Sequence, residues 1–152
     1  MDLRNCTLGE IIQFKNGKKR PQEDGQYPVY GGNGILGFSN EANYTNCIAI
    51  GRVGAYCGSV YYEPGSCWVS DNAIVALPKE ETDIKFAYYL LKSSRLNHRH
   101  IGTGQPLLTQ DILNRIECRI PSLLEQRKIA NILWLLDEKI KENQQINNNL
   151  AA

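Results

Sequence analysis

The sequence of 152 residues predicts an α+β fold, in which short strands and Gly-rich turns come first and helices follow. Short apolar runs bounded by Gly, Pro, Asn and Asp fill the first half of the chain, which is typical of strands. Apolar spacings of three and four residues begin only at Ile84. All 13 glycines and all six prolines lie within 1–121. We therefore expect a globular domain over 1–121 and a long helix over 122–152.

Local signals predict the elements of the first half. Thr7 and Glu10 form a capping-box pattern, which predicts a short helix. The Gly31–Gly34 segment, Gly-Gly-Asn-Gly, predicts a hairpin between two short strands. The strands expected from apolar runs are 27–30 and 35–38 on either side of this turn, and then 47–50, 59–62, 67–70 and 73–77.

Helical spacing dominates the second half. The face shared by Ile84, Ala87, Tyr88 and Leu91 predicts a helix. We expect a short helix over 111–115, a short strand over 116–120, and a capping box at Ser122 and Glu125 that opens the long helix.

The long helix carries an apolar stripe that ends in asparagines, which favours a coiled-coil arm. Because Trp134 lies off this stripe, we expect the helix to contact both its own domain and a second surface. The alternative is a helix docked only on its own domain. The residues expected at a dimer or partner interface are Ile129, Ile132, Leu133, Trp134, Leu136, Ile140, Asn143 and Leu150.

Composition excludes several classes of protein. Apolar residues make up 42% of the chain, which is enough for a core, and no run of 18 apolar residues could span a membrane. The first residues show no secretion signal. The five cysteines form no C-x-x-C pair, so we expect reduced thiols, no metal site and a cytoplasmic protein.

The net charge of +1 conceals an uneven distribution. Lys15, Lys18, Lys19 and Arg20 lie within six residues, and the segment 84–100 carries four cations and no acid. These cations are Lys85, Lys92, Arg95 and Arg99. The acidic segment 38–83 lies between the two basic stretches. Separate basic patches suit phosphate contacts, although solvated surface lysines would give the same pattern.

Three other motifs resemble known kinds of site. Gly32 to Gly37 matches G-x-G-x-x-G, but no helix follows it and Arg52 stands where an acid is needed, so a hairpin is favoured over a dinucleotide site. His98 and His100 have no nearby acid to orient them, which disfavours a hydrolase. The segment 102–105, Gly-Thr-Gly-Gln, indicates close backbone approach, either to DNA or to a loop that docks the helix.

A series of short motifs resembles one target recognition domain plus one conserved helix of a Type I restriction-modification specificity subunit. The motifs are Leu8-Gly9-Glu10-Ile11, Tyr27-Pro28-Val29-Tyr30-Gly31, Ile50-Gly51-Arg52-Val53-Gly54, Trp68-Val69-Ser70-Asp71-Asn72-Ala73, Gly102-Thr103-Gly104-Gln105 and, after Pro121, Glu125-Gln126-Arg127-Lys128-Ile129-Ala130. They occur in the family's order and cover nearly the whole chain.

The resemblance implies a non-enzymatic module that reads half of a split double-stranded DNA target and docks methyltransferase subunits, with no cofactor of its own. In a full subunit two such halves are joined and their helices pair antiparallel. We expect a homodimer or a pair with a different half, from a natural half-subunit or an engineered piece. An assembly protein that does not read DNA is the alternative. The expected DNA contacts are Lys18, Lys19, Arg20, Arg52, Arg95, His98, Arg99 and Gln105.

Overall fold

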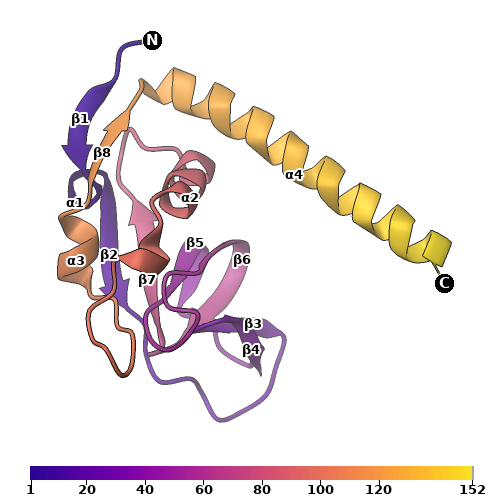
Figure 1. Cartoon of the computed structure of the whole chain (residues 1–152). Helices are drawn as coiled ribbons and strands as arrows, with labels where there is room; N and C mark the ends of the chain where they lie inside the picture. Colours follow the sequence, from indigo (N-terminus) through magenta and orange to yellow (C-terminus); the bar gives the residue numbers. More distant parts are fainter. Residues whose placement is uncertain (152) are drawn as a thin grey trace.

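The computed structural model describes residues 1–151 and confirms the α+β class, with strands in two sheets and a long C-terminal helix (Figure 1). The strands are β1 (Arg4–Thr7), β2 (Ile12–Asn16), β3 (Tyr27–Gly31), β4 (Gly34–Ser39), β5 (Tyr44–Gly51), β6 (Val60–Val69), β7 (Ala73–Pro78) and β8 (Glu117–Ile120). The helices are α1 (Leu8–Ile11), α2 (Ile84–Ser93), the 3-10 turn η1 (Leu96–His98), α3 (Gln110–Asn114) and α4 (Leu123–Ala151).

Strand pairing joins distant parts of the chain. The larger sheet has the order β2-β7-β5-β6-β3-β4, and all its pairs are antiparallel except β3 with β6. The smaller sheet pairs β1 with β8, so that Arg4 lies opposite Ile120. This pairing sets the place from which α4 leaves the domain.

The predicted hairpin and the capping-box helix are both confirmed. β3 and β4 pair antiparallel around the turn, with Gly31 opposite Gly34. Thr7 caps α1, and its backbone N–H donates to the Glu10 carboxylate at 2.5 Å. That bond and the Thr7 hydroxyl lower the pKa of Glu10.

One strand prediction is wrong. The runs 59–62 and 67–70, predicted as separate strands, are parts of the single strand β6. The sequence between them contains Pro64 and Gly65, which indicate a break. These two residues lie opposite Asn46, where the register of β5 shifts, and a bulge of this kind accommodates Pro inside a strand.

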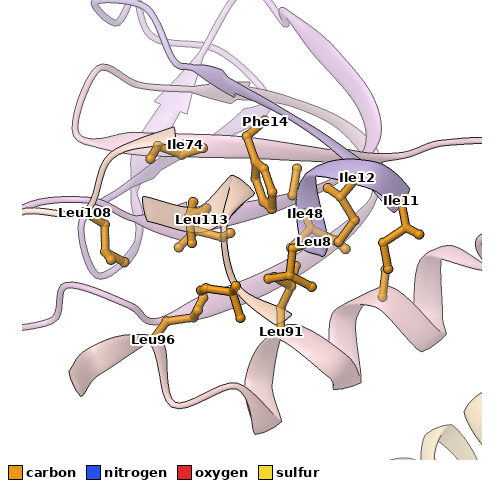
Figure 2. Packing of buried hydrophobic residues seen from close by; sticks show 14 of the residues in the cluster. Leu8, Ile11, Ile12, Phe14, Ile48, Ile74, Leu91, Leu96, Leu108 and Leu113 are labelled. Carbon is orange, nitrogen blue, oxygen red and sulfur yellow. The ribbon is translucent and has the colours of Figure 1, made fainter. Parts of the chain in front are cut away.

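A continuous apolar core joins the larger sheet to the short helices (Figure 2). Side chains from α1, β2, β5, β7, α2, η1 and α3 meet in it, among them Leu8, Phe14, Ile48 and Leu91, and Leu108 joins them from the segment before α3. In Figure 1 the loops 17–26 and 101–107 lie at the lower end of the molecule, away from the start of α4 at the upper end. The molecule therefore has a loop end and an arm end.

Candidate nucleic-acid interface and arm

The first basic segment has a fixed backbone and exposed side chains. The Lys18 N–H donates to the Val69 carbonyl at 3.0 Å, and the Trp68 indole donates to the Lys18 carbonyl at 2.9 Å. Lys18 and Lys19 are exposed. Arg20 is half-buried against β4, where a Cβ at Gly37 would lie 3.2 Å from the Arg20 Nη2. The segment therefore holds three cations beside the β3–β4 hairpin.

Hydrogen bonds fix the backbone of Arg52 beside that hairpin. Its N–H donates to the Asn72 carbonyl at 3.1 Å, and its carbonyl accepts from the Leu108 N–H at 2.8 Å. One guanidinium nitrogen lies 3.5 Å from the Asp71 carbonyl. The Arg52 Nε is buried and has no partner among the described residues. The backbone of Arg52 thus connects the turn before β7, at Asn72, with the segment after the 101–107 loop, at Leu108.

Close backbone contacts press the hairpin turn onto the end of β5. A Cβ at Gly51 would lie 2.2 Å from the Gly32 carbonyl oxygen, so only glycine fits there. The Ser59 hydroxyl donates to the same Gly32 carbonyl at 3.1 Å. This packing explains the glycine at position 51, because it leaves no room for a side chain there.

The 101–107 loop closes on itself and on the same segment. Ile101 and Leu107 exchange backbone hydrogen bonds of 2.9 and 3.0 Å, and the Gly54 N–H donates to the Pro106 carbonyl at 3.1 Å. Gly102 has φ +95° and Gln105 is exposed. The loop lies far from α4 in Figure 1, so it does not dock the helix onto the domain.

The second basic segment divides into two groups. Arg95, His98 and Arg99 are exposed around η1, which packs against Gly58, and the Arg99 Nε donates to the Ser94 carbonyl at 2.8 Å. The other two cations lie over aromatic rings. Lys85 lies over the Trp134 ring at 4.3 Å and Lys92 over the Tyr88 ring at 5.1 Å. These two lysines stabilise aromatic packing, so they are poor candidates for a phosphate patch.

The beginning of α4 is held by a buried amide. Gln126 is 1% exposed, and its Nε2 donates to the carbonyls of Glu81 and Pro121 at 3.1 and 3.0 Å. Its Oε1 accepts from the Asp83 N–H at 3.0 Å. Every polar atom of this side chain thus has a partner, and the sequence pattern gave no sign of it.

Two further contacts dock α4 onto α2 and β6. Trp134 meets Tyr62 edge to face at 5.7 Å between centroids. The Tyr89 hydroxyl donates to Asp137 at 2.6 Å, and burial together with that carboxylate raises the pKa of Tyr89. Trp134, expected at a partner interface, therefore packs within the chain.

The remaining stripe residues divide along the helix. Ile129 packs against the core, and Leu133 is half-buried. Ile132, Leu136 and Ile140 are 61%, 55% and 53% exposed, and α4 is exposed throughout from Glu138 onward. Asn143 and Leu150 belong to this exposed part. The helix therefore contacts its own domain with one face and leaves an apolar face uncovered.

The possible metal ligands, the thiols and the helix hydropathies of the described residues complete the description. Within 1–151 no three His, Cys, Asp or Glu side chains are placed to hold a metal ion. The five cysteines are free thiols, and two pairs, Cys6 with Cys118 and Cys47 with Cys67, have sulfur atoms 3.5 Å apart. Over the same residues no helix has the length and hydropathy needed to cross a membrane.

Exposed cations and an exposed amide lie on loops at one end of the sheet, and an uncovered apolar helix face lies at the other end, an arrangement typical of interaction modules. The pattern of the Type I restriction modification DNA specificity domain matches residues 2–152. The chain belongs to this family.

Known relatives agree with this assignment. The chain is 32% identical over 140 residues to the Type I restriction enzyme EcoprrI specificity subunit of Escherichia coli, covering 86% of the chain and 35% of that protein. It is also 32% identical over 146 residues to the putative type I specificity subunit S.MpnORF638P of Mycoplasma pneumoniae, covering 89% of the chain and 39% of the relative.

Solved structures show the same fold. The crystal structure of a Type I restriction-modification S subunit from M. genitalium matches with a TM-score of 0.81 at 24% identity, over 93% of this chain and 40% of that one. The HsdS subunit from Thermoanaerobacter tengcongensis matches with a TM-score of 0.67 at 18% identity, over 92% of this chain and 38% of that one. The chain thus spans well under half the length of these proteins.

Proposed function

We propose that the chain is a sequence-specific DNA-recognition module of a Type I restriction-modification system. It reads one half of a bipartite double-stranded target, docks methyltransferase subunits in the cytoplasm and performs no chemistry itself. The family match over 2–152 is the observation that carries the proposal. The exposed cations at the loop end support it, since phosphate contacts supply most of the affinity of a protein for DNA.

Two kinds of contact with DNA have different roles at the loop end. Exposed cations bind phosphates and fix the position of the domain on the duplex, whereas side chains on the rigid loops read base edges. The phosphate contacts are Lys18, Lys19, Arg20, Arg95 and Arg99, and the weaker candidates for contact or loop support are Arg52, His98 and Gln105.

A mobility-shift assay with the methyltransferase subunits present tests this function. We expect a specific complex that survives an excess of competitor DNA. If competitor DNA displaces the complex equally from every sequence tested, the alternative is favoured. In that case the chain is an assembly protein that binds the methyltransferase without reading DNA. Gln105→Ala should weaken sequence preference and leave the melting temperature unchanged, because Gln105 is exposed.

For assembly, we propose a homodimer in which two copies of α4 pair antiparallel. The helix is about 40 Å long at about 1.5 Å per residue, and its apolar face includes Ile132, Leu136, Ile140 and Ile146, each at least half exposed. An apolar face of this length favours association. A two-fold axis would give identical recognition domains at opposite ends, and hence an interrupted palindrome as the target.

Light scattering on the isolated chain tests the pairing, and Leu136→Asp with Ile140→Asp should convert the dimer to a monomer. A wild-type monomer at micromolar concentration would contradict the homodimer. A methylation map from cells carrying this chain alone tests the symmetry. An asymmetric motif would contradict the two-fold arrangement and favour pairing with a different half-subunit.

A further inference from the structure

The tip of the β3–β4 hairpin holds an exposed amide in a fixed position. Gly32 and Asn33 form the two-residue turn, and Gly34 has φ +80° after it. Asn33 is exposed, although the turn beneath it is pressed onto β5 through the Gly32 carbonyl. The backbone of the tip is therefore rigid, while the side chain of Asn33 faces solvent.

A tyrosine from β6 orients this amide. The Tyr61 hydroxyl donates to the Asn33 Oδ1 at 3.2 Å. The ring of Tyr61 is itself confined, because it lies beside Gly34 and its centroid is 6.0 Å from that of Tyr30. Within residues 1–151 the Asn33 Nδ2 makes no hydrogen bond. The amide therefore presents two donors and one unused lone pair in a set direction.

The surroundings suit the major groove of DNA. β3 and β4 form the edge of the larger sheet, and a two-stranded ribbon fits a groove about 12 Å wide. Arg20 lies against β4, and Lys18 and Lys19 are exposed on the same segment. On β4 itself Ile35, which shares a face with Gly37, is 53% exposed. Cations for the phosphates and an apolar group for a thymine methyl thus lie on the same hairpin segment as the amide.

We propose that Asn33 reads an adenine in the major groove, with Tyr61 as its positioning residue; this inference rests on the DNA-recognition function proposed above. The Asn33 Nδ2 donates to adenine N7, and its Oδ1 accepts from the adenine N6 amino group. Adenine offers an acceptor and a donor side by side, which an amide matches. Guanine offers two acceptors and cytosine one donor, so neither satisfies both ends of the amide.

The test is selection of bound DNA from a library of randomised half-sites, using the chain with its methyltransferase subunits. The wild type should require adenine at one position at least. Asn33→Ala should lose that preference by roughly 5- to 150-fold, and keep the preference at every other position. Asn33→Asp should shift the preference toward cytosine, because a carboxylate only accepts hydrogen bonds.

Tyr61→Phe tests the positioning role. It removes the bond to Asn33 and leaves the ring packing, so the adenine preference should fall less than with Asn33→Ala, while overall affinity and salt dependence stay unchanged. A matched control exists on β5, where the Tyr62 hydroxyl donates to the Asn46 Oδ1 at 2.8 Å. Asn46→Asp should change no base preference, since this pair lies beside α4, where Trp134 packs on Tyr62, and not at the hairpin tip.

The outcomes separate the two proposals. A wild-type complex that selects no sequence at all overturns the DNA-recognition function, and the adenine contact with it. A wild-type complex that selects a half-site, together with a folded Asn33→Ala variant that selects the same bases as strongly, overturns only the role of Asn33. Circular dichroism on each variant establishes that it folds, and Tyr61→Phe gives the second measurement if Asn33→Ala does not.

Discussion

The loop end and the seam between α2 and α4 contain the same kinds of residue and use them differently. At the seam, Lys85 and Lys92 lie over aromatic rings, and the Tyr89 hydroxyl meets Asp137. At the loop end, Lys18 and Lys19 are exposed on a backbone held by hydrogen bonds. A cation already bound within the chain contributes to folding, whereas an exposed cation on a rigid loop remains available for a phosphate.

The largest effect is expected from the buried amide of the seam. Gln126→Leu leaves the Asp83 N–H and the carbonyls of Glu81 and Pro121 without their partners. We expect the free energy of unfolding to fall by on the order of 3 kcal/mol, measured by urea denaturation. Gln145→Leu on the exposed part of α4 is the control and should change it little. Equal losses in the two variants would contradict the role of Gln126.

A smaller loss of stability is expected at Trp134. Trp134→Ala removes the edge contact with Tyr62 and the cation–π contact with Lys85. The free energy of unfolding should fall by about 1 to 2 kcal/mol, and Trp134→Phe should restore part of it. Leu135→Ala, at a side chain that is 65% exposed, is the matched control. An equal loss with Leu135→Ala would indicate that the seam contributes no more than the bare surface.

The salt dependence of DNA binding should respond to changes in the exposed cations and not to changes at the α2–α4 seam. Lys19→Ala should lower the slope of log K against log salt by about 0.9 for the lost phosphate contact and weaken binding to all sequences alike. Arg99→Ala should act in the same way. Lys85→Ala should leave the slope unchanged, because Lys85 lies over Trp134. Slopes unchanged by Lys19→Ala and Arg99→Ala would assign both residues to ordinary surface.

The smallest effect concerns Cys118 in the β1–β8 sheet. Burial, together with a hydrogen bond to Cys6, raises the pKa of the Cys118 thiol from 9.0 to about 12. The unfolded thiol ionises first, so its contribution to stability is present below pH 9 and is lost as pH rises toward about 12. Cys118→Ala should reduce the alkaline fall in melting temperature. An identical pH profile for the variant would contradict this assignment.

Elements that depend on neighbouring residues were predictable from the sequence. The capping box at Thr7 and Glu10, the Gly-rich hairpin and the apolar face of α2 all depend on contacts within a few residues. The length of α4 was predictable for the same reason, because a helix is built from local hydrogen bonds. The basic segment beside the hairpin was found from charge alone.

The sequence did not predict β1 and β2, because their partners β8 and β7 are far away in the chain and only tertiary pairing makes them strands. The site follows the same division. The sequence predicted phosphate contacts at Lys18, Lys19, Arg95 and Arg99, which are exposed, whereas the fold places Lys85 and Lys92 over aromatic rings. It also buried Gln126, and β6 placed Tyr61 against Asn33. Composition and local spacing determine residue types and local elements, whereas contacts between distant segments decide which side chains remain free to bind.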